Sequence, residues 1–152
     1  MIKIRKYIKR ETGNILIIFA MTFTALVGFL GIATDVGLMY AQKTRLLEIA
    51  NLMRDARFQQ IEIIWNSTTP AATFDSIVRE YGLKNGLNTS QITTQYVVKT
   101  NTTTTREVDV YIYITSTYNC SALKLFGYNN VTLKETIKGY AIKSKSPKVW
   151  KP

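Results

Sequence analysis

The sequence contains no histidine and only one cysteine among its 152 residues. The single cysteine, Cys120, cannot form a disulfide within the chain, and clusters of histidine and cysteine that hold transition metals are excluded. Ser-His-Asp and Cys-His catalysis are excluded too, because each needs a histidine base. We therefore expect no catalytic residues, no metal ligands and no cofactor. Cys120 is either a small buried apolar residue, which we favour, or an exposed thiol that can pair between chains.

Charge is absent between Glu11 and Asp35, and proline is absent before Pro70. The uncharged, mostly apolar run 14–34 is long enough, as an α-helix rising about 1.5 Å per residue, to cross roughly 30 Å of hydrocarbon. Without a proline to interrupt it, the helix can continue beyond the bilayer. We predict a membrane-spanning helix over residues 14–34.

The charges on either side of this run predict its orientation. Five basic residues precede it, and Asp35 follows it. The positive-inside rule then places the amino terminus in the cytoplasm and the rest of the chain outside. A removable secretory signal is the competing interpretation, since 31–33 resembles a cleavage site, but such signals have shorter apolar cores of about 7–15 residues.

The net charge of +10 is concentrated at the two ends of the chain. Residues 1–13 carry five basic side chains and one acidic one, and residues 138–152 carry five basic side chains and no acidic one. The stretch between them is nearly neutral and shows no nucleic-acid-binding motif, so we expect a membrane partner and no nucleic acid. We interpret the basic tail as a solvated end, with contact to an acidic partner as the alternative.

Small residues mark one face of the predicted spanning helix. Steps of four, four, three and four align Ala20, Thr24, Gly28, Gly31 and Asp35. Such a line lets another helix approach closely and predicts a helix-packing interface. Alternatively, glycine and threonine are simply tolerated there, with threonine hydroxyls bonded to their own turn. Asp35 is either a contact within a protein assembly or a marker of the water interface.

The helical period continues as an amphipathic pattern from Val36 to Trp65. Its apolar side consists of Leu46, Ile49, Ala50, Met53, Ala56 and Ile64. Pro70 and the polar residues before it end the pattern. A second helix is predicted over Ala71–Tyr81, with Gly82 as its left-handed cap.

Beyond Leu87 the period changes to two, which is typical of β-strands. We predict strands at 91–99, 106–115 and 131–143, a polar turn at 100–105 and a short helical or loop crossover at 119–127. The middle strand should turn four apolar side chains toward the helices and three side chains outward. These are Val108, Val110, Ile112 and Ile114, against Asp109, Tyr111 and Tyr113. In the last strand the apolar positions change phase, which predicts a bulge at Gly139.

Together these elements predict an α+β fold, in which a long N-terminal transmembrane and amphipathic helix is followed by a short helix and a small three-stranded antiparallel sheet. The expected organisation has five parts. They are a basic cytoplasmic leader (1–13), a transmembrane helix (14–34), an amphipathic neck (35–65), an α+β head (66–143) and a basic tail (144–152).

A membrane-tethered enzyme is an alternative interpretation, and it would need acid–base pairs drawn from four carboxylates. These are Asp75, Glu80, Glu107 and Asp109. No histidine and no glycine-rich phosphate loop accompany them. We therefore expect no enzymatic activity and no small-molecule substrate.

The residues in and after the apolar run form a pattern within about residues 10–57. It comprises Gly13, Phe19, Ala20, Gly28, Gly31, Ile32, Ala33, Asp35, Val36, Gly37, Tyr40, Leu46 and Ala50. This pattern resembles the amino-terminal signature of TadE/TadG-type proteins, which are pilin-like components of the tight-adherence (Flp) pilus machinery. The rest of the chain resembles that family only in architecture, a pilin-like lollipop.

The resemblance implies a minor pilin or pilus-assembly component that anchors, primes or caps a Flp-type pilus. Its partners would be other pilins or pilus-assembly proteins. The chain would lie in the inner membrane with a periplasmic or extracellular head, or within a surface pilus. The alternative is a single-pass membrane anchor whose ectodomain binds a partner or bridges the envelope, unrelated to pili.

Gly13 is the candidate processing site implied by the resemblance. Family members cut by a prepilin peptidase carry a glutamate five residues after this glycine, where the present chain has Ile18. The absence of that carboxylate argues against removal of residues 1–13 but leaves it open, and sequencing the mature amino terminus decides: a start at Met1 favours a permanent anchor. A start at Asn14 implies that the peptidase recognises the chain despite Ile18.

Overall fold

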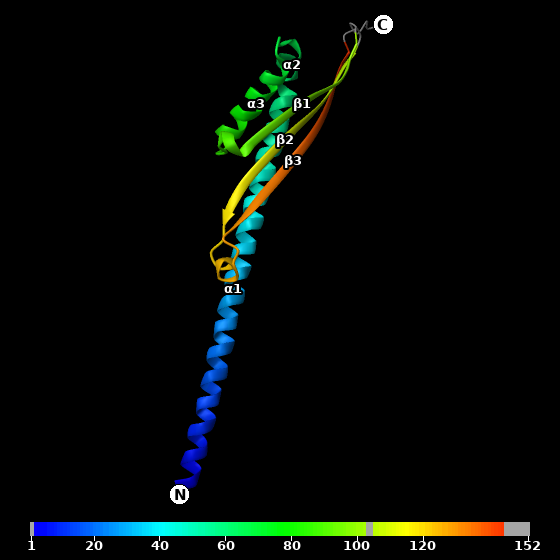
Figure 1. Ribbon diagram of the computed structural model, residues 1–152. Coiled ribbons are helices and arrows are strands. Elements are labelled where there is room, and N and C mark those ends of the chain that lie inside the picture. Colours follow the sequence, from blue (N-terminus) through cyan, green and yellow to red (C-terminus); the bar gives the residue numbers. More distant parts are fainter. Residues whose placement is uncertain (1, 103–104, 145–152) are drawn as a thin grey trace, which may run out of the picture. The chain divides into compact units, whose positions relative to one another are not determined.

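The computed structural model describes residues 2–102 and 105–144, with side chains described from residue 13 to residue 143 of those ranges (Figure 1). The basic leader's side chains and the tail beyond residue 144 lie outside this description, as does the tip of the predicted turn at residues 103 and 104. The elements are α1 (Ile2–Gln59), α2 (Ile61–Asn66), α3 (Pro70–Lys84), β1 (Ile92–Asn101), β2 (Thr105–Asn119) and β3 (Asn130–Ser144), with 3₁₀ turns η1 (Thr89–Gln91) and η2 (Leu123–Phe126). The predicted α+β fold class is confirmed.

The chain divides into two compact units. Of the described residues, the first unit combines 2–40, in the amino-terminal part of α1, with 119–131, which connect β2 to β3. The second unit contains the described residues of 41–118 and 132–144. The β2–β3 connection therefore belongs to the same compact unit as the apolar part of α1.

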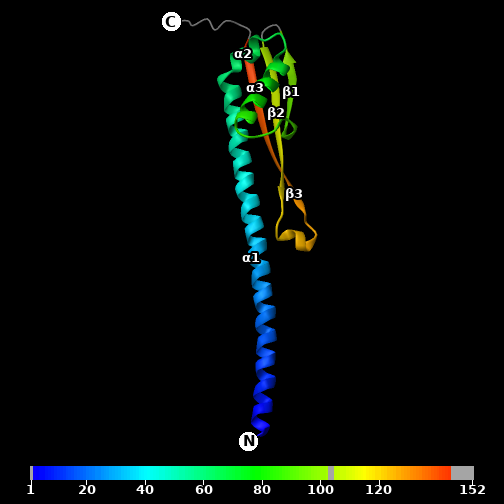
Figure 2. The same ribbon diagram turned by 90° about the vertical axis from the view of Figure 1, so that its left-hand side faces the viewer.

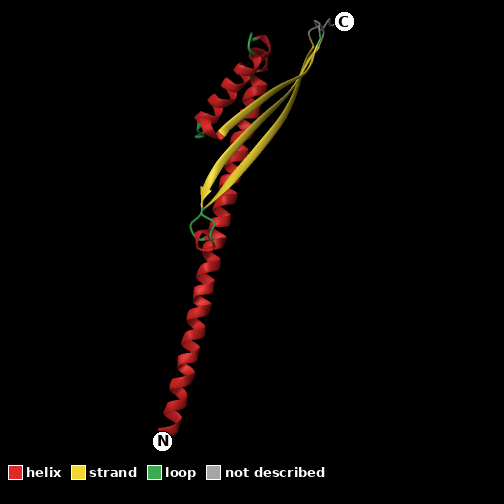
Figure 3. Cartoon of the chain, viewed as in Figure 1, coloured by secondary structure: helices red, strands yellow, loops and turns green. Residues whose placement is uncertain are grey.

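In the second unit, α1, α2 and α3 pack against one face of a three-stranded sheet with the order β1-β2-β3 (Figures 1, 2 and 3). The pairing of β1 with β2 is antiparallel, with Ile92 opposite Ile114. The buried apolar side chains of β2 are those predicted from the alternation: Val108, Val110, Ile112 and Ile114. All six positions predicted for the apolar side of the long helical pattern are also buried. The core of the head thus forms where the apolar face of α1, with a repeat of 3.6 residues, packs against the apolar face of β2, with a repeat of two residues.

The prediction that one helix continues to Trp65 is wrong, because the helix is interrupted at Gln60. Helix α1 ends at Gln59, and α2 begins at Ile61 after Gln60 leaves helical geometry, with φ −104° and ψ 20°. The amide of Ile64 still donates to the carbonyl of Gln60 over 3.2 Å. Ile64 and Trp65 are buried in the core, so burial of apolar surface favours the change of direction.

The predicted left-handed cap at Gly82 is also wrong. Gly82 lies inside α3, where it is buried and a Cβ would meet Met53 and Ile92. The chain turns instead at Gly86, whose φ is +88°. The amides of Leu87 and Gly86 donate to the carbonyls of Gly82 and Leu83, which completes a Schellman motif. Close packing therefore requires the first glycine, and the backbone turn requires the second.

No bulge changes the phase of β3 at Gly139. Odd-numbered residues are partly buried from Val131 to Lys143, and even-numbered ones are exposed, so Tyr140 and Ile142 lie on the outer face. Gly139 has a different reason for lacking a side chain, because a Cβ there would clash with the guanidinium of Arg57. This guanidinium is buried, lies 4.1 Å from the Phe58 ring centroid and makes no hydrogen bond within the described residues. Burial, followed by repulsion from Arg54, lowers the pKa of Arg57.

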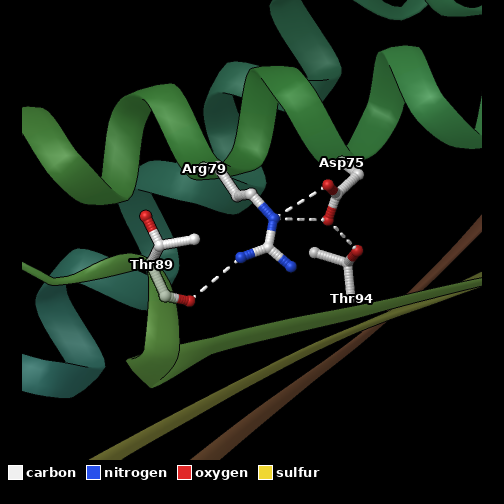
Figure 4. A network of polar contacts seen from close by, with 4 residues as sticks. All are labelled: Asp75, Arg79, Thr89 and Thr94. Atoms are coloured by element: carbon white, nitrogen blue, oxygen red, sulfur yellow. Dashed lines mark hydrogen bonds and ion pairs between the residues drawn. The ribbon is translucent and has the colours of Figure 1, made fainter.

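A polar network ties α3 to β1 at the edge of the sheet (Figure 4). The Arg79 Nε donates to both oxygens of Asp75, over 2.9 and 2.8 Å, and its Nη1 donates to the Thr89 carbonyl over 3.0 Å. The Thr94 hydroxyl also donates to Asp75. Partial burial acts to raise the pKa of the Asp75 carboxyl, but the hydrogen bonds from Arg79 and Thr94 and the charge of Arg79 outweigh it, so the net pKa is lowered.

The lowered pKa of Asp75 makes its contribution to stability depend on pH. The contribution is present above the unfolded-state pKa of about 4 and is lost as the pH falls through the lower folded-state pKa. Asp75→Asn should therefore reduce the free energy of unfolding by about 1 kcal/mol at pH 7, a figure discounted for the partial exposure of this pair. Denaturant unfolding of the full chain in detergent should show this difference shrinking below about pH 4. Glu80→Gln, which breaks the exposed pair with Lys84, is the control, and we expect it to change the free energy of unfolding little. A difference for Asp75→Asn that does not change with pH would show that the Asp75 carboxylate is not stabilised by this network.

Candidate functional site

The amino-terminal part of α1 exposes apolar side chains on every side. It is long and apolar enough to cross a membrane, its most apolar 18-residue window has a mean hydropathy of 2.5, and none of that window is buried. Ile15, Phe19 and Leu30, for example, expose 65%, 65% and 68% of their surface. Water does not favour such a surface, which suggests that this stretch associates with a membrane.

Three of the five small-face residues lie within this exposed stretch. Ala20 and Thr24 are exposed, and Gly28 has open space around the position of a Cβ. The Thr24 hydroxyl donates to the Ala20 carbonyl over 2.8 Å, so it is satisfied within its own turn. The face is free of bulky side chains in this stretch, and its role in helix packing stays a prediction. Gly13 is also exposed with open space around it, and its processing stays a prediction.

The other two small-face residues contact the chain itself. The Asp35 carboxylate is buried and accepts hydrogen bonds from three consecutive backbone amides of the β2–β3 connection. Ser121 donates to both oxygens over 3.0 Å, and Ala122 and Leu123 each donate to Oδ2 over 2.8 Å. One turn earlier, a Cβ on Gly31 would come within 2.6 Å of the Ala122 side chain. Asp35 therefore holds residues 119–131 against α1 by hydrogen bonds, and the small Gly31 allows the close approach. We call this segment the clasped loop and its hydrogen bonds to Asp35 the clasp.

The clasp satisfies a specific need of the loop backbone. The amides at the start of a helical turn lack internal acceptors, and an aspartate is a preferred cap for them. Asp35 performs this role for η2 from a distant part of the chain. Gly127, with φ +88°, then ends η2, and the amide of Cys120 donates to the Asn129 carbonyl over 3.0 Å. Cys120 is buried at the base of the loop, as we favoured from the sequence.

Sequence reasoning identified both halves of this site without joining them. It singled out Asp35 and Gly31 as a contact face and residues 119–127 as a crossover, but no periodicity links positions 86 residues apart. The available signal was a lone carboxylate at the end of an apolar run, which has to find hydrogen-bond donors.

The four carboxylates considered for catalysis have separate partners. Asp75 binds Arg79 and Thr94, and Glu80 pairs with Lys84. Glu107 accepts a 3.2 Å hydrogen bond from the Thr100 hydroxyl. None of the hydrogen bonds or ion pairs of these residues joins two of the four carboxylates. No group of three or more metal-binding side chains occurs within the described ranges.

Asp109 forms a charged cluster on the outer face of the sheet. Its carboxylate lies 2.9 Å from the Lys99 Nζ and 3.7 Å from the Lys138 Nζ, and the residue is buried. The hydrogen bond from Lys99 lowers the pKa of Asp109 and outweighs the opposing effect of burial. Tyr111 and Tyr113 stack beside it with ring centroids 6.1 Å apart. All three side chains are on the outer face as predicted, although Asp109 is covered there.

Comparison of the chain with models of protein families, with curated proteins and with solved structures found no match.

Removing the Asp35 carboxylate should release the clasped loop. In Asp35→Ala, three amides lose their acceptor, and a loss of about 2 kcal/mol corresponds to roughly 30-fold faster exchange. Hydrogen–deuterium exchange of the full chain in detergent micelles, followed in peptides covering residues 121–123, measures this directly. Thr34→Ala is the matched control, because its hydroxyl bonds only within its own helix, to the Leu30 carbonyl over 2.8 Å. Unchanged exchange at residues 121–123 in Asp35→Ala would rule out the clasp.

Proposed function

We propose that the protein is a minor pilin or pilus-assembly component of the Flp type, which anchors, primes or caps a pilus through helix packing and contacts of its head. The helix would be held with its amino terminus in the cytoplasm, either in the inner membrane or in the helical core of a filament. The proposal draws on the resemblance of residues 10–57 to TadE/TadG-type proteins.

The observation that carries this proposal is the exposed apolar stretch of α1. Its side chains are uncovered around the whole circumference, yet the same helix supplies Leu46, Ala50 and Met53 to the core of the head. One half of the helix is apolar and uncovered, and the other half belongs to a folded domain. This combination fits a pilus subunit whose helix leaves the lipid and packs against the helices of neighbouring subunits. The line of Ala20, Thr24 and Gly28 offers the face for that exchange, because small side chains allow close backbone approach.

The head offers a second surface for subunit contacts. The outer face of the sheet carries Tyr111, Tyr113 and Tyr140 together with lysines over the aromatic rings. Tyrosine is enriched in protein interfaces because it combines apolar area with a polar tip. This surface supports lateral contacts between heads.

Site-specific photocrosslinking in the native host tests the helix-packing part of the proposal. A small diazirine amino acid at Ala20 or Gly28 should capture pilin or pilus-assembly subunits, because a close-packed helix lies within reach of this face. The matched control is Leu26, which lies at similar depth on the opposite side of the helix. We expect adducts identified by mass spectrometry to form at positions 20 and 28 and to be much weaker at 26.

Two results would reject the proposal. The first is equal crosslinking at positions 20, 26 and 28 with lipid as the only adduct. This result would favour the alternative function, a single-pass membrane protein that binds a partner or bridges the envelope. The second comes from deletion of the gene, if surface fibres remain unchanged in number, length and attachment.

A further inference from the structure

We infer that the clasped loop is a membrane-surface anchor, which inserts the side chains of Leu125, Phe126 and Tyr128 into the interfacial region of the lipid bilayer beside the spanning helix. These three residues are defined here as the membrane-contact patch. The inference depends on the membrane insertion of α1 and is independent of the pilus assignment.

The patch is a local concentration of exposed apolar surface. Leu125, Phe126 and Tyr128 expose 83%, 59% and 62% of their surface, although the loop that carries them is ordered by hydrogen bonds. Gly127, between them, adopts φ +88°, which reverses the chain and leaves the aromatic side chains on either side of a tight turn. A fixed loop that exposes leucine, phenylalanine and tyrosine together is typical of a surface with a partner.

The position of the clasp identifies that partner as lipid. Asp35 is the first charged residue after the apolar run 14–34, and its carboxylate binds the loop amides at residues 121–123. Gly31, in the last turn of the run, faces Ala122. The loop backbone is therefore fixed beside residues 31–35 of α1, within about 6 Å along the helix axis. Figures 1 and 2 both show the connection between β2 and β3 beside α1.

If the run 14–34 spans the hydrocarbon, residues 31–35 lie at its boundary with the headgroups. Tyr40, about one and a half turns beyond Asp35, exposes 74% of its surface, and Val36 exposes 51%. Tyrosines at this depth form the aromatic belts of membrane proteins, and lysines place their charge among anionic headgroups. The loop supplies both in Tyr128 and the exposed Lys124. Its chemistry matches the interface at the depth where the clasp holds it.

Spin labelling of the full chain in vesicles of phosphatidylethanolamine and phosphatidylglycerol tests the inference. In a Cys120→Ala background, a nitroxide on Leu125→Cys should be shielded from a water-soluble nickel chelate and accessible to oxygen. Its depth should be about 5–10 Å into the headgroup and acyl boundary. The matched control is Ile142→Cys, an apolar residue of the outer sheet face that is 54% exposed. The control label should remain accessible to the chelate.

Adding Asp35→Ala to the labelled Leu125→Cys protein should make the nitroxide accessible to the chelate, because the loop is then no longer held at the bilayer surface. A label on Ala20→Cys should stay buried in lipid, which shows that the span itself remains inserted. Equal chelate accessibility at positions 125 and 142 would overturn the inference. Shielding that appears only at high protein-to-lipid ratio, with spin–spin broadening, would also overturn it by assigning the patch to a second copy of the chain.

Discussion

One continuous helix has to satisfy two different surroundings, and this constraint governs the arrangement of the other elements. From Gly13 to about Leu30 its side chains are uncovered and apolar, while from Leu46 onward one face is buried against a sheet. Apolar surface removed from water stabilises by about 25 cal/mol per Å² whether protein or lipid covers it. The head can therefore be small, because it needs to cover only one side of the later turns of α1.

The change between these surroundings is marked by a charged group that has full hydrogen bonding. A carboxylate at the end of an apolar run is costly without donors. Asp35 obtains donors from three backbone amides of a loop. Because backbone amides cannot be lost by substitution of a side chain, changes at positions 121 and 123, proline apart, leave these donors in place, whereas position 122 packs against Gly31 and has to stay small. The loop can then vary its side chains while its position along the helix stays fixed.

The periodic features of this chain could be predicted from its sequence, and the contacts that depend on three-dimensional proximity could not. The apolar run, the core face of α1 and the alternation of β2 each repeat within a few residues, so local pattern identifies them. Glycine proved the least predictable residue, because its role depends on what approaches it. The sequence predicts a bulge at Gly139, but this glycine leaves room for the Arg57 side chain. It predicts a helix cap at Gly82, but this glycine packs against Ile92. The union of Asp35 with residues 121–123 was equally hidden, since it joins two segments from opposite parts of the chain.

The burial of Cys120 limits the covalent chemistry that is open to the folded chain. An oxidising compartment links exposed thiols of neighbouring chains into covalent dimers. With 1% of its surface exposed at the base of the clasped loop, this sulfur is shielded from oxidants and from other chains. In the folded chain this thiol is therefore not available for a disulfide between copies, so an assembly of the proposed kind would come apart without a reductant.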